Sequence, residues 1–387
     1  MKIYPSTKEF TIYKIIKSFK RNLKKNIFLN RPKTFNSDYN YVNEAIKKKE
    51  LSTYGFYTNI FEKKLKKFTK SKYVICTNSG TSALHLALLS LKIGPNDEVF
   101  VPGFSFISAS NAVLYCKATP HFIDIEKNTM GVDPIKLKQH IKKNFTFKKN
   151  RLINKKTKRP LKAIIVVYAY GYAPRMDLIK NICKKYNVKI IEDSAEALGT
   201  YYKKKHAGTF GDVGILSFNG NKIITSGCGG AVLTNSQNLE KKIRHLATLG
   251  KVKNNYFEYD TLAYNYRLPS INAALGISQL KNLKKIISER IFIHKSYIKI
   301  FKTTKFFEIF EQPKYSKSNY WLNILILKNN VISIREKILK LFLQNKINCV
   351  PGWKTVHSMN YLKKFPKSNL DQSKLIARSI INLPSNF

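Results

Sequence analysis

Residues 78–125 read NSGTSALHLALLSLKIGPNDEVFVPGFSFISASNAVLYCKATPHFIDI, and this stretch decides the fold class. The run GTSALHLALLSL starts at a Ser/Gly/Thr cluster, and Leu84, Leu88 and Leu91 follow the i, i+4, i+7 spacing of one apolar helical face. EVFVP and HFIDI are short strand-like runs, and SFISASNAVLYC between them has a helical pattern. Strands that alternate with helices predict a parallel or mostly parallel sheet with crossover helices.

The same alternation extends from about Leu51 to Ser236. AIIVVY and VKIIED are strand-like, MDLIKNICKKYN is an amphipathic helix, and GILSF and GGAVLT form a strand pair around a polar, glycine-rich loop. Beyond about Ala263, a long basic helix, the strand-like YWLNILIL and a helix near REKILKLFLQNK indicate a smaller α+β domain. We therefore expect a basic N-terminal extension at 1–40, a large α/β domain at 41–262 and a small C-terminal domain at 263–387.

The bulk composition is that of a folded globular protein, with 387 residues of which 43% are hydrophobic and 12% aromatic. The longest apolar run, AIIVVYAYGYA, has the length of a strand, so we expect no membrane-spanning segment. The five cysteines are widely spaced and form no CxxC pair. This pattern argues against a disulfide framework and against a metal site, and it suits a cytoplasmic protein.

The formal net charge of +47 would by itself suggest a nucleic-acid partner. However, 60 of the 70 basic residues are Lys, whereas base and bidentate phosphate recognition rely on Arg. The lysines also spread over nearly every predicted helix and loop, so we predict no nucleic-acid partner and instead a positive field that attracts anionic small substrates. The basic segment at 12–28 has two interpretations: a solvated helix, which we favour, or an amphipathic helix on a membrane surface.

Two residues have the chemistry of a covalent active site. Lys222 lies in SFNGNKIITSGCGGAVLT, between two strand-like segments, where Gly220 and Gly227 permit close backbone approach. Asp193 ends VKIIED, at the carboxyl end of a predicted strand, where catalytic groups collect. Each has a simpler alternative, since a lysine is most often a solvated surface residue and an Asp before Ser-Ala often caps a helix.

Further side chains could bind an anion and a flat ring. Gly80, Thr81 and Ser82 lie at a predicted helix N-terminus, where free N–H groups favour a phosphate, and Ser217 could add a hydroxyl from the opposite side. The alternative is an ordinary capped helix. Phe106 follows a strand and is placed either to stack on an aromatic ring or to fill the core. An amine, a carboxylate, an anion cradle and a flat ring together are what pyridoxal-phosphate chemistry requires.

These pieces, with the stretches at 78–125, 190–234 and 264–280, resemble the sugar aminotransferases of the DegT family. That family has the fold of type I pyridoxal-phosphate-dependent transferases, so the resemblance implies a cofactor-binding α/β domain at 41–262 with a mostly parallel central sheet. It also implies pyridoxal 5'-phosphate as the cofactor. The resemblance runs from about Tyr41 to near the C-terminus. The chain stops at INLPSNF, where relatives commonly continue with a helix, so we expect an incomplete C-terminus or a less stable small domain.

The resemblance assigns roles to individual residues. Lys222 would hold the cofactor as a Schiff base and Asp193 would pair with its pyridinium nitrogen. Glu196 would lie beside the cofactor, and Tyr168, at a position that usually holds His, would contact the substrate side. The remaining cofactor contacts would come from Gly80, Thr81, Ser82, Phe106 and Ser217. In this family the YNYR segment crosses a dimer interface, which implies a homodimer with shared active sites, Asn265 on the phosphate of the partner's cofactor and Arg267 near the substrate.

The resemblance also implies a reaction. Related dehydratases replace the lysine with histidine, so the presence of Lys222 favours transamination. The segments EDSAEALG and SFNGNKIITSGCGG are similar to enzymes that aminate C4 of a nucleotide-linked 4-keto-6-deoxy sugar, as in perosamine, bacillosamine and legionaminic acid pathways for lipopolysaccharide, O-antigen and other surface glycans. Glutamate would be the amino donor. The alternatives are a dehydratase of the same family and a basic regulatory or nucleic-acid-binding protein.

Overall fold

The computed structural model describes residues 16–17, 29–252, 257–302 and 304–385. The predicted helix at 12–28 therefore lies almost entirely outside the described residues. In the described part of the chain, no helix combines the length and the apolar character needed to cross a membrane.

A nine-stranded sheet forms the centre of the molecule, and seven of its strands follow the order β1-β11-β10-β7-β6-β2-β3. The other two, β5 and β4, form a hairpin in which β5 pairs with the first residues of β6. The pairs β2–β3, β2–β6, β6–β7 and β7–β10 are parallel, whereas β11 is antiparallel to both of its neighbours. The main strands are β1 (Tyr73–Thr77), β2 (Glu98–Pro102), β3 (Thr119–Ile123), β6 (Pro160–Val167), β7 (Lys189–Asp193), β10 (Val213–Ser217) and β11 (Gly230–Thr234). The prediction of a mostly parallel α/β sheet is confirmed.

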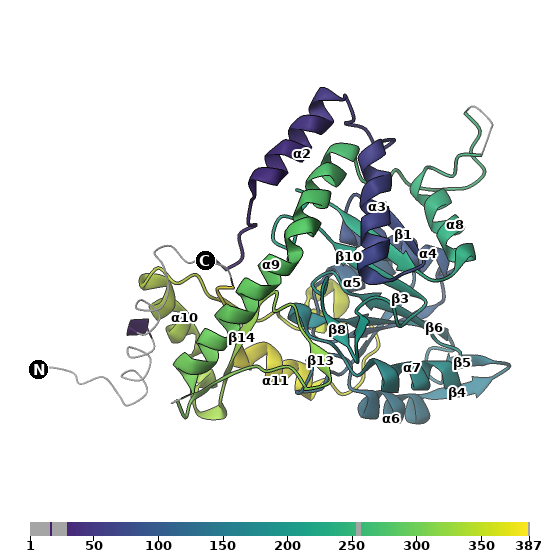
Figure 1. The fold of residues 1–387 in the computed structure, drawn as a ribbon. Helices are drawn as coiled ribbons and strands as arrows, with labels where there is room; N and C mark the ends of the chain where they lie inside the picture. The colour runs from purple at the N-terminus through teal and green to yellow at the C-terminus, as the bar shows by residue number, and fades with distance from the viewer. Residues whose placement is uncertain (1–15, 18–28, 253–256, 303, 386–387) are drawn as a thin grey trace, which may run out of the picture.

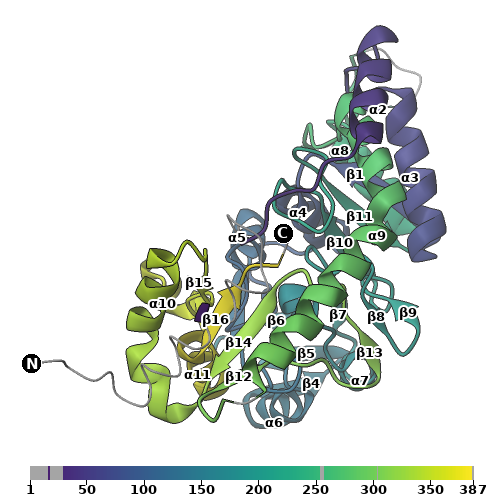
Figure 2. The same ribbon diagram turned by 60° about the vertical axis from the view of Figure 1, so that its left-hand side comes forward.

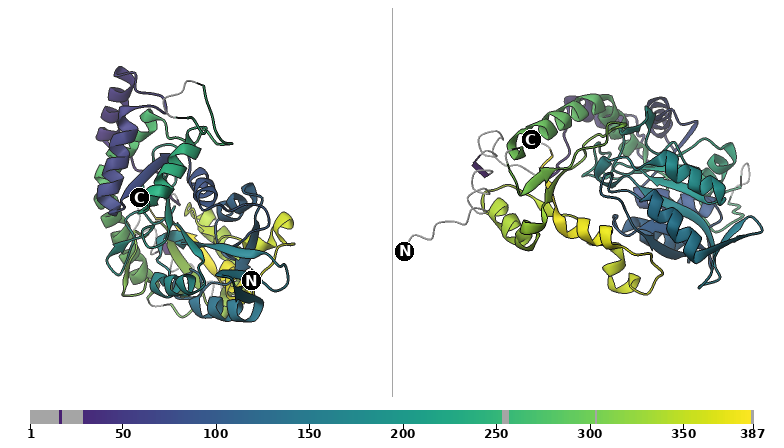
Figure 3. Two further views of the ribbon diagram at one scale, coloured as in Figure 1. Left: turned by 90° about the vertical axis from the view of Figure 1, so that its right-hand side faces the viewer. Right: turned by 90° about the horizontal axis from the view of Figure 1, so that it is seen from below.

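Helices cover both faces of this sheet because its strands are apolar on both sides (Figure 3). On one face, α4 (Gly80–Ser90), α5 (Ser108–Tyr115) and α8 (Gln237–Ala247) share a core with Ala163 and Ile165 of β6. On the other face, α6 (Pro134–Asn144) and α7 (Met176–Lys185) pack with Ile164 and Val166 of the same strand. The alternation along β6 is the two-residue period of a strand buried on both sides.

A second, four-stranded antiparallel sheet lies toward the C-terminus, in the order β12-β14-β16-β15. Its strands are β12 (Phe307–Ile309), β14 (Asn323–Leu327), β15 (Val350–Pro351) and β16 (Ile380–Leu383), with α10 (Arg335–Gln344) and α11 (Asp371–Ser379) beside it (Figure 2). This smaller sheet and its helices confirm the predicted α+β part of the fold.

The helix α9 (Ser270–Phe301) runs the length of the molecule (Figures 1 and 2). It contacts α2 (Asn36–Lys47) and α3 (Phe56–Thr69), and it also contacts strand β12 of the C-terminal sheet. One element therefore joins the N-terminal helices to the second sheet.

The hairpin formed by β4 (Phe145–Lys148) and β5 (Arg151–Asn154) is not anticipated by the sequence analysis, because it lies between lysine-rich segments on both sides. Its two-residue turn, Lys149 and Asn150, has φ values of 48° and 57°, as a type I′ turn requires. Phe145 and Leu152 are buried in the core, but most side chains of β4 are exposed, and four residues are too few for a clear alternating pattern.

Candidate active site

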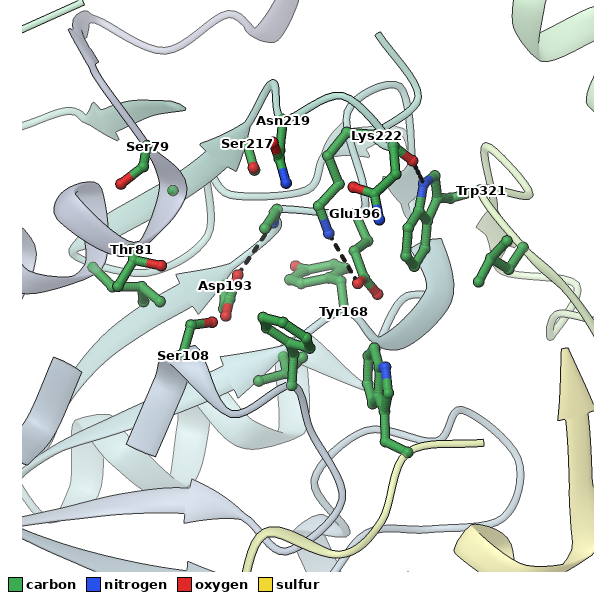
Figure 4. Close-up of a pocket in the computed structure, with 18 of the residues that line it drawn as sticks. Ser79, Thr81, Ser108, Tyr168, Asp193, Glu196, Ser217, Asn219, Lys222 and Trp321 are labelled. Atoms are coloured by element: carbon green, nitrogen blue, oxygen red, sulfur yellow. Dashed lines mark hydrogen bonds and ion pairs between the residues drawn. The ribbon is translucent and has the colours of Figure 1, made fainter. Parts of the chain in front are cut away.

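A cavity of about 390 Å³ lies where the carboxyl ends of β6, β7 and β10 meet the N-terminus of α4 (Figure 4). Residues of the second sheet, including Val350, Pro351 and Asn382, complete its wall. The polar residues that line it are Ser79, Thr81, Ser108, Tyr168, Asp193, Glu196, Ser217, Asn219, Asn221 and Lys222. The parallel sheet therefore collects polar groups at its carboxyl edge, as open α/β sheets do.

The amine of Lys222 points into this cavity (Figure 4). Its side chain is 12% exposed, and its Nζ lies 3.1 Å from Glu196 Oε1 and 4.4 Å from the centre of the Trp321 ring. The backbone N–H of Tyr170 donates to the second oxygen of Glu196 at 2.8 Å. Burial raises the pKa of Glu196, and the nearby positive charge of Lys222 opposes that rise. The cavity therefore holds one accessible amine beside one oriented carboxyl group.

Asp193 ends β7 and faces the same cavity from the floor of the sheet (Figure 4). The backbone N–H of Ala195 donates to its Oδ1 at 3.2 Å. Burial raises the pKa of Asp193, while this hydrogen bond and the charge of Lys222 lower it. A buried carboxyl group held at the end of a strand can hold a proton on a basic ring nitrogen.

The N-terminus of α4 forms another wall. Ser79 caps the helix, since its Oγ accepts from the Ser82 backbone N–H at 3.0 Å. Gly80 and Thr81 line the cavity, together with Ser217 at the end of β10. A Cβ on Gly80 would lie 3.0 Å from the Cβ of Ser217, so glycine allows the helix to start close to this strand. The first turn of a helix leaves backbone N–H groups free for an anion.

Ser82 does not line the cavity. Its hydroxyl lies 2.8 Å from the Ser79 hydroxyl, so this side chain takes part in the helix cap. The capped-helix interpretation is thus compatible with a role in the cavity, since Gly80 and Thr81 line the cavity while Ser82 bonds to the cap.

Two predicted aromatic residues line the cavity. Phe106 is 52% exposed and lies 6.3 Å, centre to centre, from the Trp353 ring. Tyr168 is fully buried, and its hydroxyl donates to Glu192 Oε2 at 2.5 Å. Because that hydroxyl is bonded to Glu192, Tyr168 presents its ring rather than its hydroxyl to the cavity.

Asn265 and Arg267 are not among the residues that line this cavity in the single chain. The backbone carbonyl of Asn265 accepts from Asn78 Nδ2 at 3.4 Å, and the guanidinium of Arg267 lies 4.2 Å from the centre of the Tyr54 ring. Both lie in the segment that the resemblance assigns to a shared interface, so their predicted roles concern a second copy of the chain.

The two tryptophans of the chain, Trp321 and Trp353, belong to none of the predicted site motifs, yet both line the cavity. Trp353 stacks on Tyr170 with the ring centres 4.3 Å apart. Trp321 lies two residues before β14 in the strand-like run YWLNILIL, where the hydrophobic pattern indicated only a buried strand. The only feature of the sequence that could have drawn attention to them is that tryptophan occurs just twice in the chain.

The chemistry of these groups fits pyridoxal phosphate. The start of α4 with Ser217 suits its phosphate, the carboxyl group of Asp193 suits its ring nitrogen, and the amine of Lys222 suits its aldehyde. The cavity also offers aromatic faces for its ring.

Comparison with known proteins agrees with this geometry. The sequence profile of the DegT/DnrJ/EryC1/StrS aminotransferase family matches residues 33–386. The chain belongs to this family. Proteins of the DegT family are pyridoxal-phosphate-dependent aminotransferases, and so is this chain.

Individual DegT-family relatives cover nearly the whole chain. GDP-perosamine synthase of Vibrio cholerae is 33% identical, and the alignment covers 92% of each chain. The UDP-4-amino-4,6-dideoxy-N-acetyl-β-L-altrosamine transaminase of Campylobacter jejuni is 34% identical over 85% of this chain and 84% of that one. The structure of Helicobacter pylori PseC, an aminotransferase involved in the biosynthesis of pseudoaminic acid, superposes with a TM-score of 0.83 at 27% identity, covering 93% of this chain and 94% of that one.

Proposed function

We propose that this aminotransferase converts the C4 keto group of a nucleotide-linked 4-keto-6-deoxy sugar to an amine, with glutamate as the donor, for surface glycan biosynthesis. The observation that carries the proposal is the single cavity in which the Lys222 amine, the Asp193 carboxyl group and the α4 N-terminus meet. The relatives support the substrate class, since one is a synthase of a GDP-linked sugar, perosamine, and the other is a transaminase of a UDP-linked 4-amino-4,6-dideoxy sugar.

Pyridoxal phosphate, when bound, would supply an aldehyde for the amino group and a ring that withdraws electrons. Lys222 would bind the aldehyde carbon and would later move a proton with its Nζ. Asp193 would hold a proton on the ring nitrogen, and its burial keeps water from competing for that proton. Phe106 would cover one face of the ring.

The phosphate group would bind at the N-terminus of α4. Gly80 and Thr81 would contribute backbone N–H groups and Ser217 its hydroxyl. A nucleotide-linked sugar carries a diphosphate, and the net charge of +47 gives the protein a positive field that would draw such an anion toward the surface. The charge thus supports encounter with the substrate, while the cavity selects the chemistry.

The test is a panel of GDP-, UDP- and dTDP-linked 4-keto-6-deoxy sugars, each incubated with the purified enzyme, pyridoxal phosphate and glutamate. We expect the 4-amino sugar and 2-oxoglutarate in equal amounts with at least one nucleotide, and neither product with Lys222→Ala. Loss of a sugar hydroxyl without gain of nitrogen would assign a dehydratase instead. Salt-dependent DNA binding without any transfer of nitrogen would contradict the proposal in favour of a nucleic-acid function.

A further inference from the structure

The peptide bond between Asn221 and Lys222 is held on both sides. The Lys222 N–H donates to the Asn219 carbonyl at 3.0 Å. On the other side, the Asn221 carbonyl accepts from the indole Nε1–H of Trp321 at 2.7 Å and from Nδ2 of Asn30. Because a peptide unit is planar, contacts to its oxygen and its N–H fix the plane that leads into the Cα of Lys222.

Asn30 reaches this carbonyl from an N-terminal segment, residues 29–33, that is tied down at several points. The Leu29 carbonyl accepts from the Ser385 N–H at 2.9 Å, and Lys33 Nζ lies 2.6 Å from Glu289 of α9. Leu29 itself lines the active-site cavity. The segment therefore forms part of the cavity wall, and through Asn30 it also supplies a hydrogen-bond donor to the Asn221 carbonyl.

The orientation of the Asn30 side chain is dictated by its two partners. Arg290 of α9 is 4% exposed, and its guanidinium donates to Asn30 Oδ1. A guanidinium only donates and a backbone carbonyl only accepts. The Asn30 amide must therefore give its oxygen to Arg290 and its NH₂ group to Asn221.

Trp321 is fixed independently of Asn30. It lies next to β14, and the backbone N–H of Trp321 donates to Asn319 Oδ1 at 2.9 Å. The Asn319 amide donates in turn to the Glu196 carbonyl at 2.9 Å. Trp321 thus connects the loop that carries Lys222 to the loop that carries Glu196, whose carboxyl group lies beside the same amine.

We infer that Asn30 and Trp321 are positioning residues for Lys222, two side-chain donors that hold the Asn221 carbonyl and so place the lysine amine for bond formation with the cofactor. This inference rests on the proposed role of Lys222. A lysine side chain has four rotatable bonds, so its amine is directed only if its backbone is fixed. Holding a reacting group in the correct place is a major source of rate.

The variants separate the hydrogen bonds from the packing. Trp321→Phe keeps an aromatic face beside Lys222 but removes the indole N–H, and Asn30→Ala removes the other donor. The double variant leaves the Asn221 carbonyl without either. Asn345→Ala is the matched control, because it removes a side-chain amide that also donates to a backbone carbonyl, that of Leu341, at a residue outside the active-site cavity.

The measurement is the rate constant with which the cofactor-free enzyme attaches pyridoxal phosphate covalently to Lys222. It is followed by visible absorbance and verified by borohydride fixation and peptide mass spectrometry. We expect each single variant to slow attachment by about two- to tenfold, the worth of one hydrogen bond. The double variant should slow it by more than the product of the two effects, because the carbonyl loses its last donor. Asn345→Ala should match the wild type.

A double variant that attaches the cofactor at the wild-type rate would overturn the inference, as would equal slowing by Asn345→Ala. The thermal unfolding midpoint of every variant is measured as well. If the attachment rate falls only in proportion to a fall in the unfolding midpoint, the effect reflects instability and counts against positioning. Lys222→Ala separates this inference from the proposed function. If Lys222→Ala still attaches the cofactor covalently, the assignment of Lys222 is wrong. If Lys222→Ala fails to attach it while the Asn30 and Trp321 variants attach it at the wild-type rate, only the roles of Asn30 and Trp321 are wrong.

Discussion

At the scale of single residues, Asp193 is the group whose environment most directly sets its chemistry. It is buried at the end of β7, beside Lys222 and with one backbone N–H on its Oδ1. The carboxyl group is thereby oriented and shielded from water, so a charge opposite it would be stabilised more strongly than at the surface. This is the setting in which a carboxylate can keep a ring nitrogen protonated.

Asp193→Asn tests that role. The amide is nearly the same size but cannot carry the negative charge, so we expect the cofactor to bind covalently while glutamate-dependent formation of 2-oxoglutarate falls by about a hundredfold or more. The measurement is the single-turnover rate with glutamate, alongside the visible absorbance of the bound cofactor. A rate within a factor of two of the wild type would show that Asp193 does not assist the reaction.

At the scale of elements, the close approach of α4 to β10 depends on the missing side chain of Gly80. In Gly80→Ala the new Cβ would lie 3.0 Å from Ser217 Cβ and 3.2 Å from its Oγ, so helix and strand must separate by a few tenths of an ångström. We expect pyridoxal phosphate to bind about tenfold more weakly, since the phosphate contacts come from both elements. Equilibrium dialysis with the cofactor measures the change.

The matched control is Gly94→Ala, where an added Cβ has no heavy atom within 4 Å. Alanine has a higher helix propensity than glycine, so Gly80→Ala should not weaken α4 itself. A loss of cofactor affinity without a loss of thermal stability would therefore be caused by the crowding between α4 and β10. Equal affinities in the two variants would show that the distance between α4 and β10 does not govern phosphate binding.

The short strand β9 (Lys205–His206) makes the fold sensitive to acid. His206 is buried, its Nδ1 lies 2.5 Å from the Ala207 carbonyl, and its Nε2 accepts from the Gly199 N–H at 2.9 Å. Burial lowers the pKa of His206 from 6.5 to about 4. Between these values the unfolded chain binds a proton that the folded chain does not, so stability is complete above pH 6.5 and falls toward pH 4.

The expected size of this effect is about 3 kcal/mol of unfolding free energy over the whole window. In His206→Gln the titrating group is absent, and the loss of stability between pH 7 and pH 4.5 should be smaller. Urea unfolding of both proteins across this range measures the two slopes. Parallel slopes would mean that other groups, such as the half-buried His140, account for the acid sensitivity.

At the scale of the whole molecule, one chain contains an active-site cavity and also two residues whose predicted roles are in the cavity of a partner chain. The cavity is lined from the central sheet, α4, the second sheet and the N-terminal segment, whereas Asn265 and Arg267 lie apart from it. The predicted homodimer would give those two residues a role across the interface.

Mixing two inactive variants tests this arrangement. Lys222→Ala lacks the amine, and Asn265→Ala lacks the predicted phosphate contact to the partner. If the sites are shared, random reassembly places an intact Lys222 opposite an intact Asn265 in about a quarter of all sites. We expect about a quarter of the wild-type activity after mixing and none from either variant alone. Independent sites would leave the mixture as inactive as its components.

The sequence by itself determined the alternating strand and helix order, the strand pair β10–β11 and the cluster of Lys222, Asp193 and the α4 start. The element order and the strand pair follow from local patterns, namely a hydrophobic period and a glycine-rich loop, whereas the grouping of Lys222, Asp193 and the helix start was expected from the carboxyl edge of the predicted sheet and from the family resemblance. The β4–β5 hairpin escaped detection because its strands are only four residues long and lie in a lysine-rich stretch, so the few apolar residues, such as Phe145 and Leu152, give only a short periodic signal.

Only the tertiary structure decided which distant residues meet around Lys222. Asn30 lies 191 residues from Asn221 and Trp321 lies 100 residues from it, yet both donate to the same carbonyl. Such contacts have no signature in a single sequence, because a hydrogen bond between separated segments depends on how α9 and the second sheet place them. The tertiary structure also turned the Tyr168 hydroxyl toward Glu192, since a buried hydroxyl needs a partner and that carboxyl group lies within reach.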